Sequence, residues 1–594
     1  MRGETSREIL RRVAVGAVAV GFAVAVGVGW AQIAPPPLDP AHNVALPCEL
    51  VSTPGALPRS AKNLAHVANV CGIVGTDVEF QSRRAADGLH DYAFLGTMGG
   101  GLRIFDITDP ARPHPAGAYT DAGWQNDVQV RGNLAVVGFD PLSGSLPAPS
   151  MSACLQAKSA NGGVDLVRLE FDPVAARFAT SRMDCVPNPP GGGAHNSTLH
   201  PSGKWLAMTN PRSHGSIDVV DLRGPVPVRA FRIVQDGSLA NAVCTSAALA
   251  PARCMSNGRT GTWSPHDIAF SRNGNRMYVS AVGNDTVIVN VSNVLSGSVS
   301  TIGVVPNDRN GGGVANDRND ISISHQSDPS ADEAILGVTD ERGGGLQETS
   351  CNTDPNGVIG GIHFWRLPIT GVANTSRRLG AWFYPNPELE LDAIGRLQRA
   401  CTIHVFRMGG NGTAGPGSIQ TGYDGVSSLP RRQLVSAHYG AGVWHIDFSR
   451  ASTSSDGIAE DPQSTWGNTL GWNVMPGAET WSAKEYKGYI YAGDMARGFD
   501  VYQFAPCEGI GCIDLPVPPC LPGDDDLDDD GLDDELEDIF GWLIEDPDSD
   551  DDGVRDGNED SDRDGEDDED EDDATDRCPD DGDGDGVDDE DEDD

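Results

Sequence analysis

The stretch Gly101-Leu-Arg-Ile-Phe-Asp-Ile107 decides the fold, because its pattern recurs six more times along the chain. Each copy begins with Gly or another turn residue and continues with apolar residues interrupted by polar ones, as expected for a strand. The seven copies span residues 101–107, 163–169, 216–222, 285–291, 361–367, 442–448 and 498–504. Seven similar strands at intervals of 53 to 81 residues predict a repeat architecture.

A second apolar strand accompanies most copies across a short turn. These strands cover residues 92–96, 134–138, 205–208, 277–281, 334–338, 433–437 and 489–493. A hairpin cannot bury both of its faces alone, so seven similar sheets are expected to stack around an axis. The sequence therefore predicts an all-β, seven-bladed β-propeller over residues 61–505. Gly/Asn/Ser-rich segments near 141–162, 237–262, 304–318, 343–360 and 451–478 are predicted to be long loops.

Two segments at the ends of this region resemble a known family. Gly-Leu-Arg-Ile-Phe-Asp-Ile-Thr-Asp-Pro-Ala-Arg-Pro (101–113) and Gly-Tyr-Ile-Tyr-Ala-Gly-Asp-Met-Ala-Arg-Gly-Phe-Asp-Val (488–501) are similar to the LVIVD repeat of bacterial surface β-propellers. The resemblance extends over about residues 85–505. It implies a propeller fold and an extracytoplasmic setting, and it implies no defined reaction.

The first 31 residues predict a signal peptide. Four Arg precede an apolar run at 13–28, and Gly29-Trp30-Ala31 provides a small-residue cleavage site after Ala31. The Arg11-Arg12 pair fits either a twin-arginine or an ordinary signal. An uncleaved anchor is the alternative, although the run is short for a span. We therefore expect an extracytoplasmic protein, secreted or at the cell surface, with no integral membrane span after cleavage; the outer membrane and the periplasm both fit.

Two short segments frame the propeller. Residues 32–60 are rich in Pro and predict an extended linker. Residues 506–523 combine three Cys with five Pro and predict a hinge pinned by disulfides. In an exported protein the twelve Cys favour disulfides over metal sites, because none shows CxxC spacing. Cys244–Cys254 and Cys507–Cys512 are candidate bridges.

Most of the net charge of −46 lies in the tail, where residues 524–594 contain 42 Asp and Glu against 3 Arg. Such a segment repels nucleic acid and attracts cations. We therefore expect no nucleic-acid partner.

Four windows of the tail match a calcium-binding loop, with carboxylates at positions 1, 3, 5, 9 and 12 and Gly at position 6. The carboxylates are Asp526, Asp528, Asp530, Asp534 and Glu537; Asp548, Asp550, Asp552, Asp556 and Glu559; Asp560, Asp562, Asp564, Asp568 and Glu571; and Asp581, Asp583, Asp585, Asp589 and Glu592. The spacing suits calcium because a large hard cation takes 6–8 oxygen ligands. Calcium is thus the predicted cofactor.

The alternative is a solvated acidic tail that matches by chance. The placement of Glu argues against a chance match, because only 9 of the 71 tail residues are Glu and yet Glu occupies position 12 in all four loops. The second and third loops abut at Glu559-Asp560, which leaves no room for the helices of EF-hands. With Asp576-Arg-Cys-Pro579, the tail resembles thrombospondin type 3 repeats, in which calcium ions form most of the core.

Polar residues stand where the innermost strands of several blades are expected to begin. The candidates for a channel site are His195, His266, His404, Asp127 and Asp267. If they converge, the imidazoles could ligate copper, zinc or iron; the alternative is the ordinary polar lining of a wet channel. His325, His438 and His445 are weaker candidates.

Two functions remain open. The first is an exported calcium-binding surface protein, whose propeller head binds a surface protein or polysaccharide on a calcium-stiffened tail. The second is a metal-dependent oxidoreductase or hydrolase with a His/Asp site at the channel mouth. The sequence contains no GxSxG, HExxH or phosphate-binding loop followed by Lys-Ser/Thr. It therefore favours the binding protein and assigns no catalytic residue.

Overall fold

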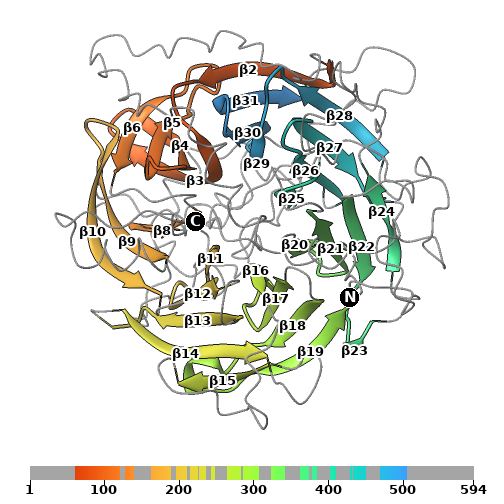
Figure 1. Ribbon diagram of the computed structural model, residues 1–594. Coiled ribbons are helices and arrows are strands. Elements are labelled where there is room, and N and C mark those ends of the chain that lie inside the picture. Colours follow the sequence, from red (N-terminus) through yellow and green to blue (C-terminus); the bar gives the residue numbers. More distant parts are fainter. Residues whose placement is uncertain are drawn as a thin grey trace, which may run out of the picture. The chain divides into compact units, whose positions relative to one another are not determined.

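The computed structural model describes residues 60–120, 127–139, 162–188, 195–210, 215–224, 227–235, 243–247, 264–281, 285–306, 321, 323–341, 361–373, 378–383, 402–409, 429–430, 432–449 and 468–504. Within these ranges the protein is all-β, apart from short 3-10 turns such as η2 (Val294–Ser296). No helix in the described part is long and apolar enough to cross a membrane. The strands form seven sheets arranged around a central axis (Figure 1).

Each sheet is one blade. Blade 1 contains β3 (Gly75–Ala85), β4 (Gly88–Thr97), β5 (Leu102–Asp106) and β6 (His114–Tyr119); blade 2 contains β7 (Val128–Arg131), β8 (Leu134–Phe139), β9 (Gly163–Asp172) and β10 (Arg177–Pro187). Blade 3 contains β11 (Ser197–Leu199), β12 (Trp205–Asn210), β13 (Ser216–Asp221), β14 (Val228–Gln235) and β15 (Val243–Ala247). Blade 4 contains β16 (Pro265–Phe270), β17 (Arg276–Ala281), β18 (Thr286–Asn290), β19 (Ser300–Val305) and β23 (Gly371–Val372).

The remaining three blades complete the ring. Blade 5 contains β20 (Ser324–Pro329), β21 (Ile335–Asp340), β22 (Gly361–Arg366) and β24 (Arg378–Phe383). Blade 6 contains β25 (Phe406–Met408), β26 (Gln433–Ala437), β27 (Val443–Asp447), β28 (Asn468–Val474) and β1 (Ser60–Lys62). Blade 7 contains β29 (Thr480–Tyr486), β30 (Tyr489–Asp494), β31 (Gly498–Phe504) and β2 (Leu64–Val70). The predicted seven-bladed propeller is confirmed.

The recurring phrase forms the third strand of every blade. Its copies are β5, β9, β13, β18, β22, β27 and β31, and each pairs antiparallel with the second strand of its blade. In blade 1, for example, Asp106 faces Tyr92 and Leu102 faces Gly96. These strands are mostly apolar and buried along their length because a middle strand packs against a neighbouring blade on each face.

The two ends of the described chain close the ring. β2 pairs antiparallel with β31, so Leu64 faces Phe504 and Val70 faces Phe499. β1 pairs with the outer strand β28 of blade 6. The innermost strands also contact one another in a complete circle, in the order β3, β7, β11, β16, β20, β25, β29 and back to β3. The innermost edges of the sheets therefore face one another around the channel, and the outermost strands form the rim of the ring.

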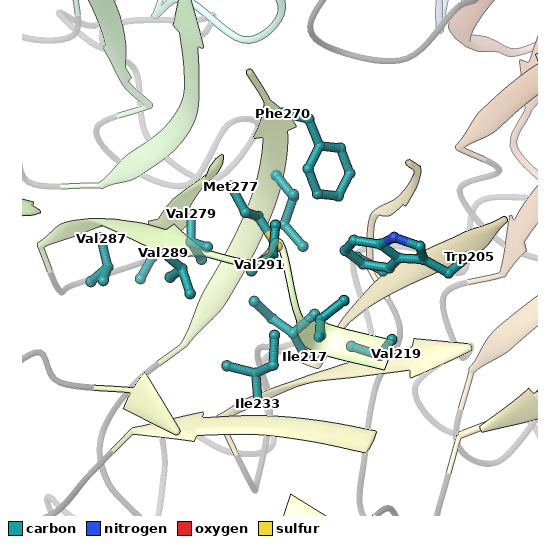
Figure 2. Packing of buried hydrophobic residues seen from close by; sticks show 14 residues of the cluster. Trp205, Ile217, Val219, Ile233, Phe270, Met277, Val279, Val287, Val289 and Val291 are labelled. Atoms are coloured by element: carbon teal, nitrogen blue, oxygen red, sulfur yellow. The ribbon is translucent and has the colours of Figure 1, made fainter. Parts of the chain in front are cut away.

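Apolar side chains fill the spaces between adjacent blades. Between blades 3 and 4, Trp205 and Val219 pack with Phe270, Met277 and their neighbours (Figure 2). All four of these side chains are buried. Burying a side chain of this size contributes about 1.5–3 kcal/mol, so the interfaces between blades hold the ring together.

Polar contacts tie the first hairpin turn of one blade to that of the next. His200 Nε2 in blade 3 donates to the Gly274 carbonyl in blade 4 at 3.0 Å. Arg276 in blade 4 pairs with Glu333 in blade 5 at 2.9 Å. Arg432 in blade 6 donates from Nη1 to Asp332 of blade 5 at 2.9 Å. These contacts fix the angle between successive blades at the face opposite the channel mouth described below.

Two segments predicted as loops contain strands. β28 lies within 451–478 and pairs with both β27 and β1, because Leu470, Trp472 and Val474 alternate as in an ordinary strand. β15 lies within 237–262 and extends the outer edge of blade 3. The signal peptide, nearly all of the linker, the hinge and the calcium loops lie outside the described residues, as does at least one cysteine of each candidate bridge.

Candidate metal centre in the propeller channel

Bulges at the start of the innermost strands turn extra side chains into the channel. In blade 4 the register shifts between Pro265 and Asp267, so that His266 is the additional residue. Blade 7 has the same shift around Trp481. In blade 5 the shift lies between Ser324 and Ser327 and includes His325. Bulges commonly re-aim a side chain beside a functional site.

Four histidines from four consecutive blades meet at this end of the channel. The ring centroids of His195 and His266 are 4.1 Å apart, those of His266 and His325 are 4.3 Å apart, and those of His325 and His404 are 4.2 Å apart. His266, His325 and His404 are almost completely buried. Blades 3 to 6 thus each contribute one imidazole to a continuous arc, the histidine arc.

The outer ring nitrogens of the arc contact backbone carbonyls of the next blade. His404 Nδ1 lies 2.7 Å from the Trp481 carbonyl, and His266 Nδ1 lies 3.2 Å from the His325 carbonyl. A carbonyl only accepts, so Nδ1 carries the proton and Nε2 keeps its lone pair. Histidines that ligate metal ions are usually oriented by such a contact.

Glu341 completes the group. It follows β21, and its carboxylate lies 3.8 Å from His325 Nε2 and 3.9 Å from His404 Nε2. Ligand atoms of His266, His325 and Glu341 all lie within 4.8 Å of one another. Two ligands bonded to one ion at about 2.1 Å are at most about 4.2 Å apart, so small side-chain rotations bring this set around an ion.

Tyr439 holds Glu341 from the neighbouring blade. Its hydroxyl donates to Glu341 Oε1 at 2.5 Å, and the side chain is buried. The backbone of Tyr439 has a φ of 41°, which a non-glycine residue adopts only when its surroundings enforce it. Reciprocal backbone hydrogen bonds with Thr480, each 3.0 Å long, enforce this conformation.

The protonation states suit a cation. Burial and the neighbouring histidines hold the pKa of His266 and of His325 well below the usual range, and burial lowers the pKa of His404 to about 3. The imidazoles are therefore neutral, which is the form that ligates metals. Burial raises the pKa of Glu341 to about 7, against the hydrogen bond from Tyr439, which lowers it.

Charged residues form a floor below the histidine arc. Lys484 of blade 7 pairs with Asp77 of blade 1 at 3.0 Å and donates to Glu79. Asp127 Oδ2 accepts from the backbone N–H of Ser197 at 2.7 Å. Asp267 Oδ1 accepts from the N–H of Ile268, also at 2.7 Å. Asp77, Asp127, Asp267 and Lys484 line one cavity together with His195, His325 and His404.

The structure thus places all five sequence candidates, His195, His266, His404, Asp127 and Asp267, around one channel. His266 belongs to the possible ligand set, and the two Asp belong to the floor. The prediction that His325 is a weaker candidate than these residues is wrong, because His325 lies at the centre of the histidine arc. His438 and His445 instead contact Ser436 and Gln433 within blade 6.

A constant position in the hairpin could have revealed His325. In each of these four blades, the residue four positions after the histidine lies in the first strand and pairs with an apolar residue of the second strand. The pairs are Leu199–Leu206, Phe270–Met277, Pro329–Leu336 and Met408–Leu434. His195, His266 and His325 therefore each precede that apolar residue by 11 positions.

Comparisons with known proteins agree with the fold. The LVIVD repeat family model matches residues 89–121, a segment that runs from β4 through β6. The protein is therefore a seven-bladed β-propeller that contains an LVIVD repeat. This class of fold is compatible with a surface or binding protein. No curated protein matches the chain.

Solved structures with similar folds are distant. One is the β-propeller domain of Cps50 (Swd1) from Myceliophteria thermophila, with 9% identity and a TM-score of 0.37, covering 74% of this chain and 99% of that one. Another is Sqt1 from Chaetomium thermophilum, with 11% identity and a TM-score of 0.36, covering 70% of this chain and 80% of that one. Neither likeness carries an argument about function.

Proposed function

We propose that this protein binds one transition-metal ion at the channel mouth, through His266, His325 and Glu341, with His195 and His404 beside them. The single observation that carries the proposal is the convergence of ligand atoms from His266, His325 and Glu341 within 4.8 Å in a buried place. Neutral imidazoles with a carboxylate suit zinc, copper or iron better than calcium or magnesium, which prefer oxygen ligands.

Two further features support a metal over an ordinary polar channel lining. His266 and His404 have their Nδ1 atoms engaged by carbonyls, so their Nε2 lone pairs are available. The backbone of His404 interacts with the buried ring of His325 as well, and this contact raises the pKa of that ring against the stronger effect of burial. The neutral rings of His266, His325 and His404 also lie side by side, so several nitrogen ligands for one ion are present in one buried place.

The test is metal analysis of the full mature chain after incubation with zinc, copper or iron in excess calcium. We expect one transition-metal ion per chain in the wild type and loss of that ion in His266→Ala/His325→Ala. His114→Ala, which removes a histidine that is half exposed in blade 1, serves as the control and should retain the ion. Equal metal content in all three proteins would overturn the proposal.

The acidic tail supports a second function. We infer that residues 524–594 bind calcium through the four loops, and that the protein is exported and works at the cell surface or beyond. The propeller would then be a head that binds a surface protein or polysaccharide, carried on a calcium-stiffened tail. The observation that favours this function is the Glu at position 12 of every loop.

Matched substitutions within the tail separate calcium loops from plain acidity. Changing the four position-12 residues to Gln (Glu537, Glu559, Glu571 and Glu592) should abolish most calcium uptake measured by calorimetry on the full chain. Changing four other Glu of the tail to Gln (Glu535, Glu545, Glu566 and Glu590) removes the same charge and should leave most uptake in place. Equal losses in the two variants would favour a merely charged tail.

A further inference from the structure

Lys484 of the last blade contacts Glu79 of the first blade. Lys484 lies in β29 and Glu79 in β3, and the Lys484 ammonium donates a hydrogen bond to Glu79 Oε1. Close by, the Ser482 hydroxyl donates to the Thr76 carbonyl at 2.7 Å, which fixes how these two innermost strands lie against each other. The packing of blades 7 and 1 therefore holds the amine and the carboxyl in contact, although 405 residues separate them in the chain.

Both side chains are almost completely buried. Of the four lysines that the structure describes, only Lys484 is buried. A buried ion loses several kcal/mol of hydration, and pairing with an opposite charge often recovers this loss only in part. One neutral amide in place of the two charges would not suffer that loss. The interior of the channel therefore favours condensation of Lys484 with Glu79 more than water does.

A second carboxylate stands beside the amine. Asp77 Oδ1 lies 3.0 Å from Lys484 Nζ, where it can accept a proton and leave the nitrogen with a lone pair. Burial lowers the pKa of Lys484, but the attraction of Asp77 and Glu79 raises it overall, so the free amine is a minor form and its reactions are slow. Burial raises the pKa of Glu79 to about 7, so its carboxyl is partly in the neutral form that an amine attacks.

Arg407 of blade 6 faces the other oxygen of the Glu79 carboxyl. Its Nη1 lies 4.0 Å from Glu79 Oε2, an oxygen that has no hydrogen bond within the described residues. Negative charge collects on a carboxyl oxygen when an amine adds to the carbon, and a buried cation beside that oxygen stabilises it. Lys484, Asp77 and Arg407 thus place a nucleophile, a proton acceptor and a positive charge around one carboxyl group.

We propose that Lys484 and Glu79 condense to an isopeptide bond, which closes the ring covalently. Lys484 Nζ attacks Glu79 Cδ, the new Nζ–Cδ bond replaces one Cδ–O bond, and two of the ammonium protons leave with that oxygen as water. Asp77 relays the protons, and the water enters the cavity that Asp77 and Lys484 line. The step needs no metal, oxidant or nucleotide, so the inference is independent of the proposed metal and calcium sites.

The arrangement of these groups favours the bond in two ways. Reacting groups that are held in contact reach effective molarities of about 10⁵ M or more. The product also keeps an N–H that can donate to Asp77, and Asp77 and Arg407 remain as one negative and one positive group. The four side chains together thus carry no formal net charge before or after the reaction. Until it reacts, the chain keeps the ion pair described above.

Mass spectrometry of tryptic peptides from the full mature chain tests the bond. Trypsin releases residues 63–83 as one peptide, and it cannot cleave after an acylated Lys484, so that residue stays within the peptide 451–487. We expect these two peptides to be joined, with the mass of one water missing from their sum. A wild-type protein that yields only unlinked peptides and is cleaved freely after Lys484 would overturn the proposal.

Two variants and one internal comparison assign the reaction. Lys484→Arg keeps a positive charge but offers no nucleophilic amine, so the joined peptide should be absent. Asp77→Asn, with its fold checked by circular dichroism, keeps the reacting pair; because acid–base catalysis contributes about 10²–10⁴ in rate, the joined peptide should accumulate about tenfold or more slowly. Lys487 lies 3.3 Å from Asp91 but is partly exposed, and it should stay unlinked. A joined peptide in Lys484→Arg, an unchanged rate in Asp77→Asn or a link at Lys487 would each contradict this mechanism.

Discussion

The Tyr439 hydroxyl lies 2.5 Å from Glu341 Oε1, and it reaches that position from a backbone with a φ of 41°. Tyr439 belongs to the turn between β26 and β27 of blade 6, whereas Glu341 follows β21 of blade 5. One blade therefore orients the only carboxylate of the possible ligand set on its neighbour. The contact couples the geometry of the metal site to the packing of two blades.

Tyr439→Phe should weaken metal binding without unfolding the propeller. A hydrogen bond to a charged group contributes about 1.5–3 kcal/mol, and loss of a contact that orients a ligand usually costs 10–100-fold in metal affinity. Competition with a chromophoric chelator measures the affinity. Tyr489→Phe, at a partly buried tyrosine of blade 7, is the control and should bind as the wild type does. Unchanged affinity in Tyr439→Phe would show that Glu341 is held by other contacts.

Acid should destabilise the protein partly through His200. Burial lowers the pKa of His200 to about 4, against the hydrogen bond to the Gly274 carbonyl, which raises it. The unfolded state, with a pKa near 6.5, takes up the proton first as the pH falls. The contribution of His200 to the free energy of unfolding is therefore fully present above about pH 6.5 and is lost progressively down to about pH 4. By pH 5 the free energy of unfolding has fallen by about 2 kcal/mol through this residue.

His200→Gln removes this titration. Urea unfolding at pH 7 and pH 5 should show the variant losing about 2 kcal/mol less than the wild type between the two conditions. His114→Gln, at a half-exposed position, should keep the wild-type pH dependence. An equal loss in wild type and His200→Gln would contradict the assignment.

Removing the Lys484 ammonium should destabilise the channel floor. Lys484→Met leaves Asp77 and Glu79 buried without the ammonium group, while Arg407 stays 4.0 Å from Glu79, and breaking a buried pair in this way costs about 3–5 kcal/mol. Adding Glu79→Gln to Lys484→Met should recover part of the loss, because one uncompensated carboxylate is then gone. The exposed pair Arg112–Asp109 offers a comparison, since Arg112→Met should cost less than about 1 kcal/mol. Equal effects of the two Met substitutions, measured by chemical denaturation, would refute this account.

Shortening a buried side chain of β2 should destabilise the pairing of β2 with β31 that closes the ring. Leu64 is buried against blades 6 and 7, so Leu64→Ala should lower the free energy of unfolding by about 2–5 kcal/mol. Val67→Ala changes a partly buried residue of the same strand and should cost clearly less. If the two variants have the same urea midpoint, β2 contributes little to closure.

The sequence predicted the fold because the third strand of each blade repeats one pattern, from Leu102–Asp106 to Gly498–Phe504. It also placed His195, His266 and His404 at strand starts, where a ring brings them together. Glu341 and Tyr439 could not be found in this way, because both follow strand ends in turns where no period constrains the residue type. Their partnership depends on the angle between two blades, which packing across the interface sets.

The N-terminal strand has a consequence for when the protein can finish folding. Leu64 pairs with Phe504, so more than 400 residues separate the partners of the closing sheet. Until the last strand has left the ribosome and, for an exported chain, has crossed the membrane, blade 7 lacks one of its four strands and the circle stays open. Six nearly complete blades must therefore avoid contacts with other proteins until the strand that ends at Phe504 is available to pair with β2.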